Sequence, residues 1–358
     1  MPSFYMHLKS QSLSSSIQSQ SAPDVTVVIP AFNRNEIIES TLKSVVSSKG
    51  DISIEIIIVD DGSDQPVEHF LGHPYIDFCK VIRQQNQGLL FARLTGLMAA
   101  LGRYVLFLDS DDLISADKLA SHVQTMDDHT LDISYTNTAT GTMTQSGEGY
   151  AVKNFQEVSE TADHAYFLLR IQPAPHSPVF RRDYLLKAVE MAPMPPSKQY
   201  NPIAEIYFYL VCSLLPARPG KCAGLAITCV HPGIRITNHW EPMGLAALAI
   251  MESFMATAPS TILGENAKNY VAEAAFHTWR ALPYDFPVSV RRRFRAVACY
   301  ASKKRLGDTG GNNFRILCRL LGPIAVGVIL RRIKGAPYRK SKTMSLGELE
   351  HLIEGLDS

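Results

Sequence analysis

The segment Tyr104-Val-Leu-Phe-Leu-Asp-Ser-Asp-Asp112 is an apolar strand pattern that ends abruptly in carboxylates. Alternate side chains of extended backbone share one side, so we expect Asp109 and Asp111 to point the same way. Two ionised carboxylates repel each other unless a cation bridges them or one binds a proton, and hard oxygen ligands suit Mg²⁺ or Mn²⁺. The segment therefore indicates a divalent-cation site or, alternatively, a polar turn that leads into a helix capped by Ser115 or Asp117.

Two earlier segments show the same pattern of a buried strand followed by polar residues. They are Val25-Thr-Val-Val-Ile-Pro-Ala-Phe-Asn33 and Glu55-Ile-Ile-Ile-Val-Asp-Asp-Gly-Ser63. Helix-forming sequence follows at Glu36–Ser48, Leu89–Leu101 and Lys118–Asp127. This alternation predicts an α/β fold with a mostly parallel sheet flanked by helices, Rossmann-like in its nucleotide-binding half. Ligands of such sheets bind beyond the carboxyl ends of the strands, where the polar residues fall.

A known family has these motifs in the same order. Pro30-Ala-Phe-Asn33, Asp60-Asp-Gly-Ser63, Asn86-Gln-Gly88, Ala92-Arg93 with Gly96, and Asp109-Ser-Asp-Asp112 resemble the motifs of family 2 inverting glycosyltransferases. The resemblance covers residues 24–135 well and continues more weakly to residue 237. It implies a GT-A fold and a bacterial-type transferase that moves one sugar at a time.

The resemblance also implies roles for individual residues. Asp61, with Asp60 beside it, would contact the base or ribose of a nucleotide-sugar, for which a UDP-sugar is favoured. Asp109 and Asp111 would hold Mn²⁺ or Mg²⁺ on the diphosphate. The same donor site would include Pro30, Asn33, Arg93 and Ser110. His231, in a His-Pro-Gly segment, would face the diphosphate or the cation.

Each of these roles has a structural alternative. Asp60-Asp61-Gly62 is also a good turn sequence without any ligand. Arg93 suits a phosphate through its guanidinium fork, but it also suits a solvent-facing helix position or a structural ion pair. Leu94 stands where relatives carry an asparagine. His231 is also consistent with a surface turn, and we expect His176 to be structural.

The catalytic base is less clearly marked. Inverting transfer needs a carboxylate that takes the proton of the acceptor hydroxyl. Relatives carry a Glu-Asp pair near the start of a later helix, and the matching stretch, Asn201-Pro-Ile-Ala-Glu205, retains one acid. We expect Asn201 to cap this helix, Pro202 to fill its first position and Glu205 to act as base, with Asp183 and Glu190 as reserves. A glutamate early in a helix is also favourable without catalysis.

Charge is distributed unevenly along the chain. Residues 280–343 hold sixteen Lys and Arg against Asp285 and Asp308, which gives +14 and leaves −13 for the remainder. Within them, the uncharged apolar run 320–330 is too short to span a bilayer. Basic residues around an apolar run favour an element on an anionic membrane surface, which would fit a lipid-linked acceptor. The alternatives are a helix docked on the catalytic domain and a nucleic-acid surface, and no binding motif supports the latter.

We expect three parts: a flexible Ser/Gln-rich tail at 1–22, a catalytic domain at 23–237, and a mainly helical basic region at 238–358. The tail lacks the long apolar core of a signal peptide. Six cysteines without metal-type spacing indicate reduced, buried thiols of a cytoplasmic protein, peripheral on the inner face of the cell membrane if the basic region binds there.

Several other classes do not fit the sequence. It lacks the Gln-x-x-Arg-Trp motif of processive synthases and the glycine-rich first loop of nucleotidyltransferases, and a receiver module would not need the acidic strand end. The predicted function is therefore transfer of one sugar to a saccharide or lipid-linked saccharide in cell-surface polysaccharide or glycan biosynthesis. The alternative is a degenerate GT-A protein that binds a nucleotide-sugar or a partner without turnover, because the second acid beside Glu205 is missing.

Overall fold

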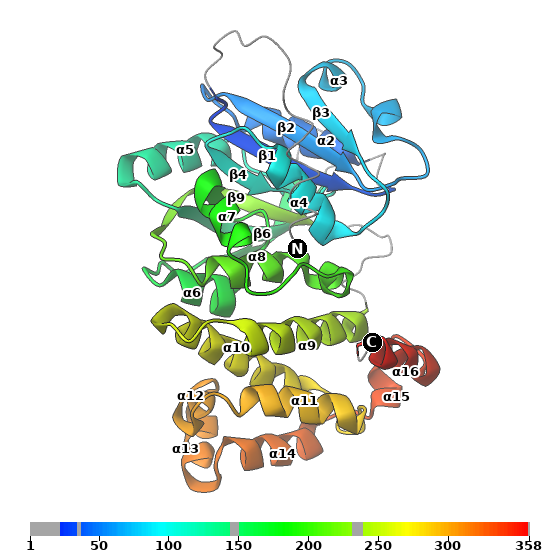
Figure 1. The fold of residues 1–358 in the computed structure, drawn as a ribbon, viewed down its shortest axis with the longest axis vertical. Helices are drawn as coiled ribbons and strands as arrows, with labels where there is room; N and C mark the ends of the chain where they lie inside the picture. The colour runs from blue at the N-terminus through cyan, green and yellow to red at the C-terminus, as the bar shows by residue number, and fades with distance from the viewer. Residues whose placement is uncertain (1–21, 34–36, 144–149, 231–238, 357–358) are drawn as a thin grey trace.

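The structure, a computed structural model, describes residues 22–33, 37–143, 150–230 and 239–356. Its mixed sheet runs in the order β3-β2-β1-β4-β8-β6-β9-β5, and β7 pairs with β6 (Figure 1). Helices flank this sheet, and a helical region follows the last strand (Figure 1). The predicted α/β class and the helical C-terminal region are therefore confirmed.

The first half of the fold is the parallel part of the sheet. It consists of β1 (Val25–Ala31), β2 (Ile54–Asp60), β3 (Cys79–Arg83) and β4 (Tyr104–Phe107). The connecting helices are α2 (Ile38–Ser47), α4 (Leu89–Ala99) and α5 (Lys118–His129), close to the predicted ranges. Two short turns, η1 (Val67–Phe70) and α3 (Tyr75–Phe78), precede β3. This half places the ends of β1, β2 and β4 at one edge.

The second half adds mostly antiparallel strands. They are β5 (Leu113–Ile114), β6 (Ile133–Met143), β7 (Tyr150–Gln156), β8 (Val179–Arg181) and β9 (Pro219–Cys229). Between them lie α6 (His164–Tyr166), η2 (Phe167–Ile171), α7 (Arg182–Glu190), η3 (Lys198–Ile203) and α8 (Ala204–Cys212). β8 joins the halves, because it pairs antiparallel with both β4 and β6.

Side-chain alternation along β1 separates two core layers. Val27 and Ile29 pack in one layer with residues of α2 and α5, whereas Val28 packs in the other with residues of α4 and α8. Gly96 lets α4 approach β1 closely, because a Cβ there would lie 2.2 Å from a methyl carbon of Val28. This close approach explains why the Ala-Arg motif is accompanied by a glycine.

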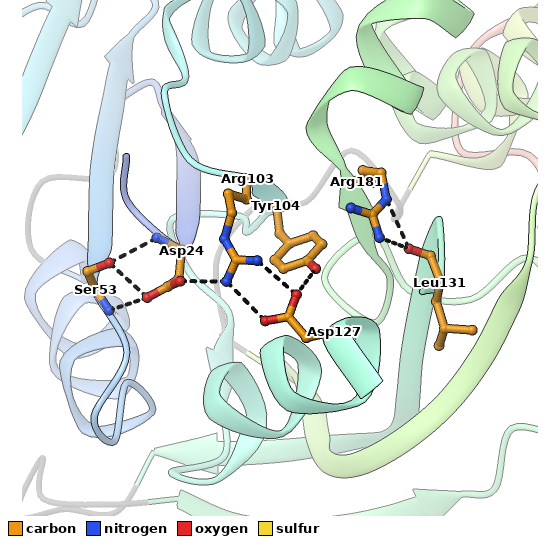
Figure 2. Close-up of polar contacts among 7 residues, drawn as sticks. All are labelled: Asp24, Ser53, Arg103, Tyr104, Asp127, Leu131 and Arg181. Carbon is orange, nitrogen blue, oxygen red and sulfur yellow. Dashed lines mark hydrogen bonds and ion pairs between the residues drawn. The ribbon is translucent and has the colours of Figure 1, made fainter. Parts of the chain in front are cut away.

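A polar network fastens the amino end of the sheet, away from the strand ends described above. Arg103, just before β4, donates to Asp24 at 2.7 Å and to Asp127 of α5 at 2.8 Å (Figure 2). The Tyr104 ring lies between the guanidinium groups of Arg103 and Arg181, 5.1 and 5.4 Å from its centroid. These ion pairs tie β1, β4 and α5 together at the amino end of the sheet. They involve none of the polar residues at the carboxyl ends of the strands.

The C-terminal helices are α9 (Trp240–Thr257), α10 (Ile262–Ala281), α11 (Val288–Ala298), α12 (Lys303–Asp308), α13 (Asn312–Leu321), α14 (Pro323–Lys334), α15 (Tyr338–Ser341) and α16 (Leu346–Glu354). In Figure 1, α9 and α10 lie between the sheet and the helices α11–α14. One core cluster runs from β1 through α8 into these helices. The helical region therefore shares its core with the sheet.

Two expectations for this region need correction. The apolar run 320–330 is not one element, because Gly322, with φ of 78°, separates α13 from α14. All six cysteines are free, but only Cys212, Cys229 and Cys318 are buried; Cys79 and Cys222 are partly buried and Cys299 is exposed. None of the described helices has both the length and the apolar character needed to cross a bilayer.

Candidate active site

A cavity of about 630 Å³ opens beyond the carboxyl ends of β1, β2 and β4. Six of the predicted site residues line it: Pro30, Asp61, Asp109, Ser110, Asp111 and Glu205. The remaining lining residues are Ala31, Phe32, Asn86, Gly88, Leu89, Ala92, Asp112, Pro175, Asn201, Pro202, Thr228 and Met243. Met243 belongs to α9, so the helical region contributes to the wall. His231 lies outside the described residues.

Asp61 is held by the loop that leads into α4. Its carboxylate accepts hydrogen bonds from the backbone N–H groups of Gln87 (2.9 Å) and Gly88 (2.7 Å), and from the Gln84 amide (2.7 Å). The residue is only 3% exposed, yet it lines the cavity. The loop therefore fixes one carboxylate at the wall in a defined orientation.

Asp60 faces away from the cavity and organises the turn after β2. It accepts from the N–H groups of Ser63 (2.9 Å) and Val67 (3.2 Å) and forms an ion pair with Arg83 at 2.8 Å. Because both of its oxygens are engaged and it does not line the cavity, this geometry favours a positioning role. Its predicted contact with a donor stays a prediction.

Asn33 joins the loops that follow β1 and β2. Its side chain donates to Asp64 at 3.2 Å and accepts from the Asp64 N–H at 2.9 Å, while its own N–H donates to Ser63. Its φ of 50° is left-handed, a conformation that asparagine tolerates better than most residues. Asn33 thus joins the two loops and does not line the cavity.

The acidic segment is a turn, which corrects the expectation of extended backbone. β4 ends at Phe107, and the N–H of Asp112 donates to the Asp109 carbonyl at 3.0 Å. The Thr41 hydroxyl of α2 contacts the carbonyls of Ser110 and Asp112 at 3.0 and 2.9 Å, which clamps the turn. The turn, rather than strand alternation, brings Asp109 and Asp111 to the same cavity.

The side chains of Ser115 and Asp117 do not cap α5, so the alternative interpretation of the acidic segment as a capping turn is not observed. Asp117 is the N-cap of α5 but makes no side-chain cap hydrogen bond. The Ser115 hydroxyl instead donates to Asp117 and accepts from the N–H of Leu225, and so ties the turn to β9. Ser115 therefore connects the acidic turn to β9 and does not cap α5.

Arg93 of α4 is buried between two carboxylates. Its Nη2 lies 2.6 Å from Oδ1 of Asp109, and its Nη1 lies 3.6 Å from Oε2 of Glu205. Burial disfavours its charge, but Asp109 and Glu205 outweigh that cost and raise the pKa of Arg93. The side chain is 1% exposed, so the structural ion pair is the arrangement observed, and it links the acidic turn to α8. Leu94, beside it, packs in the core.

Glu205 lies in the first turn of α8, on a helix that is otherwise apolar. Its side chain is 29% exposed, toward the cavity that it lines. Burial raises the pKa of Glu205, and the neighbouring Arg93 opposes that rise. A raised pKa suits a group that accepts a proton. The reserves, Asp183 and Glu190, are exposed on α7 and do not line the cavity.

The predicted cap of this helix is wrong. Asn201 and Pro202 lie in η3, and α8 begins only at Ala204. The Asn201 amide instead accepts from the N–H of Leu90 at 3.0 Å and donates to the Gln87 carbonyl at 3.1 Å, so it caps α4. It reaches that helix because Gly88 leaves the space: a Cβ there would lie 1.9 Å from its Nδ2.

Asp112 also lines the cavity, although it was not among the predicted site residues. Its two partners are distant in the chain, and only the fold brings them to it. Its carboxylate accepts from the N–H of Cys229 at 2.9 Å and lies 3.4 Å from Nδ1 of His176. His176 is fully buried, and burial lowers its pKa to about 4, so the imidazole is neutral. The third acid of the Asp109-Ser-Asp-Asp112 run was the available sequence signal.

The acidic turn offers two carboxylates, Asp109 and Asp111, to a divalent cation. Among the residues that the structure describes, no three His, Cys, Asp or Glu side chains gather as a metal site. Asp109 and Asp111 do line one cavity, and Mg²⁺ is usually bound by one or two carboxylates with substrate phosphates completing its shell. The pair therefore fits a cation that binds together with a diphosphate.

Known proteins are similar to residues 26–180 in sequence and to nearly the whole chain in fold. Residues 26–180 match the family described as glycosyl transferase family 2. An uncharacterized glycosyltransferase of Rickettsia conorii is 32% identical over 114 residues, which cover 32% of this chain and 19% of the relative. The succinoglycan biosynthesis protein ExoO of Rhizobium meliloti is 31% identical over 106 residues, 29% of this chain and 30% of the relative. The matched part is thus under a third of either relative.

The crystal structure of S. aureus TarS 1–349 in complex with UDP-GlcNAc superimposes with a TM-score of 0.58 and 15% identity, covering 90% of this chain and 93% of that one. At this identity the likeness concerns the fold, which is of the GT-A type predicted from the motifs. The sequence match covers the ends of β1, β2 and β4 at the cavity but not Glu205, and the fold likeness extends over both. Residues 26–180 of this chain thus match glycosyl transferase family 2 in sequence, and the fold of the chain agrees with that match.

Proposed function

We propose that this protein transfers one sugar from a nucleotide-sugar, with a UDP-sugar favoured, to a saccharide or lipid-linked saccharide, with inversion at the sugar carbon. The observation that carries the proposal is the array Glu205–Arg93–Asp109 at the wall of a cavity that Asp61 also lines. It joins a carboxylate suited to an acceptor hydroxyl to the carboxylates suited to a nucleoside diphosphate.

The donor side is supported by its chemistry. The Asp61 carboxylate can accept hydrogen bonds from a uracil-type N–H or from ribose hydroxyls. Asp109 and Asp111 would hold Mn²⁺ or Mg²⁺, which when bound would stabilise the departing diphosphate. TarS, with the same fold, was crystallised with UDP-GlcNAc, which makes a UDP-sugar the first donor to test.

The acceptor side rests on Glu205. In the proposed step the acceptor oxygen attacks the sugar carbon, its proton passes to the Glu205 carboxylate, and the bond to the nucleoside diphosphate breaks. One displacement of this kind inverts the sugar carbon. Arg93 would not touch the reacting atoms; it would hold Glu205 and Asp109 in register from within the core.

Consumption of nucleotide-sugars tests the proposal directly. The protein is incubated with UDP-, GDP- and dTDP-sugars, Mn²⁺ and a panel of saccharide and lipid-linked acceptors, and released nucleoside diphosphate is measured. UDP release that depends on acceptor supports transfer. Binding of UDP in a thermal-shift assay without consumption of any donor favours instead the degenerate GT-A protein, whose best argument is Ala204 where relatives carry a second acid.

Substitution of the base separates catalysis from binding. We expect Glu205→Gln to lower kcat by about 10² to 10⁴-fold, the usual contribution of a general base, and to leave UDP binding unchanged. Asp183→Asn is the matched control, because Asp183 is 88% exposed and away from the cavity. Unchanged turnover in Glu205→Gln would remove Glu205 from the mechanism.

A further inference from the structure

A second cavity, of about 460 Å³, lies in the helical region between the end of α10, α11 and α14. Five arginines line it, Arg291, Arg292 and Arg295 from α11 and Arg331 and Arg332 from α14, together with Trp279. No acidic side chain is among its described lining residues. The cavity thus concentrates cationic side chains contributed by two helices.

Arg331 forms the buried floor of this cavity. It is 6% exposed, donates to the carbonyls of Leu282 (3.1 Å) and Pro283 (2.7 Å), and lies 5.6 Å from the Trp279 ring centroid. Burial, and then the charge of Arg291, lower the pKa of Arg331. Gly327 allows this packing, because a Cβ there would lie 2.5 Å from the Trp279 ring. A buried cation is fixed in place with another cation beside it.

The five arginines that line the cavity lack acidic partners among the residues that the structure describes. Over the described part of the chain, none of them forms an ion pair with a carboxylate, whereas Arg293 of the same helix pairs with Glu252 at 2.6 Å. Arg305 pairs with Glu273 at 2.6 Å. Arginines with carboxylate partners therefore lie close in sequence to the cavity, but the five that line it have none among the described residues.

The start of α11 adds to the positive potential. Val288, its first residue, lines the cavity, and the helix has neither a side-chain cap nor an acid in its first turn. The unsatisfied N–H groups at a helix start favour an anion. Two independent features, the arginines and the helix start, therefore favour negative charge at one place.

We propose that this cavity binds a phosphate-bearing group, independently of the donor site. Guanidinium forks match phosphate oxygens in geometry, and several arginines suit a group with more than one negative charge. Such a group can come from a lipid or from a free phosphate compound. Two exposed apolar side chains of α14, Ile329 (44% exposed) and Ile333 (72% exposed), would contact the acyl region if the phosphate belongs to a lipid.

The test compares two triple variants of the full chain. The cavity variant is Arg291→Gln, Arg292→Gln and Arg295→Gln. The control variant is Lys303→Gln, Lys304→Gln and Arg319→Gln, which removes the same charge from exposed positions outside the cavity. Inorganic pyrophosphate is titrated without metal and followed by tryptophan fluorescence, to which Trp279 of the cavity contributes together with Trp240. Flotation is measured with phosphatidylcholine vesicles with and without phosphatidic acid.

We expect the cavity variant to bind at least one of the two phosphate probes about tenfold more weakly, or worse, while the control variant binds like the original protein. Loss of vesicle flotation identifies a lipid source, and loss of pyrophosphate binding alone identifies a soluble one. Equal weakening in both variants, or no binding of either probe to the original protein, overturns the proposal. UDP binding retained in the cavity variant shows that its fold and donor site are intact.

Discussion

The two cavities differ in how their charged side chains are partnered. In the cavity at the sheet edge, Arg93 is paired with Asp109 and Glu205, and Asp61 accepts three hydrogen bonds from one loop. In the helical cavity, five arginines converge without a carboxylate among the described residues. The first arrangement is organised before any ligand binds. The second leaves its charge for a ligand to neutralise, because like charges close together repel.

Removal of Arg93 should give the largest change, because it leaves two carboxylates at the cavity wall without their cation. We expect Arg93→Met to lose about 2 to 4 kcal/mol of stability. Arg93 lowers the pKa of Glu205, so its loss raises that pKa, and the base is then ionised only at higher pH. The acidic limb of the kcat profile should move up by about one pH unit, measured as transfer rate against pH.

Arg83→Met is the control for this change. It also removes an arginine from an aspartate, Asp60, but away from the cavity, and its side chain is 40% exposed. A loss of stability without a shift of the pH profile is expected. An identical shift in both variants would contradict the coupling of Arg93 to Glu205.

Substitution of Gly88 tests whether the cavity at the sheet edge depends on the loop that leads into α4. Its φ is 92°, and an added Cβ would collide with the Asn201 amide that caps α4. We expect Gly88→Ala to cost about 1 to 3 kcal/mol and to weaken UDP binding, because the N–H of Gly88 holds Asp61. Denaturant unfolding and UDP titration measure the two effects.

Gly244→Ala provides the comparison, since nothing lies within 4 Å of its Cβ position in α9. An alanine inside a helix should stabilise by up to about 1 kcal/mol without effect on UDP. If both variants bind UDP equally well, the Gly88 loop does not organise the donor site.

The smallest expected change in stability compares Arg293, which has a carboxylate partner, with Arg292, which lines the helical cavity. Arg293→Gln breaks the ion pair with Glu252 and should cost about 0.5 to 1 kcal/mol. Arg292→Gln removes one of the converging charges and should be neutral or slightly stabilising. Thermal unfolding at low ionic strength measures both, and added salt should reduce the difference. A cost for Arg292→Gln as large as that for Arg293→Gln would indicate that the helical cavity is not electrostatically strained.

Much of the sheet and its acidic edge could be predicted because the signals are local. β1, β2 and β4 are runs of apolar residues that stop at polar turns, and six predicted residues do line one cavity. Strands such as β5, of two residues, carry too little local pattern to be recognised, because pairing with β9 defines them. Asn201 was assigned to the wrong helix for the same reason: its partner, Leu90, is 111 residues away.

The sequence by itself therefore determined the α/β class, the carboxylates at the sheet edge and the basic character of residues 280–343, because strand periodicity, turn residues and charge are properties of neighbouring residues. Only the tertiary structure decided which charges meet. Arg93 became a buried bridge because α4 lies between the acidic turn and α8. Arg291 and Arg331 share a cavity because Gly327 lets α14 pack closely on α10. Contacts of this kind join residues distant in the chain, and no local pattern records them.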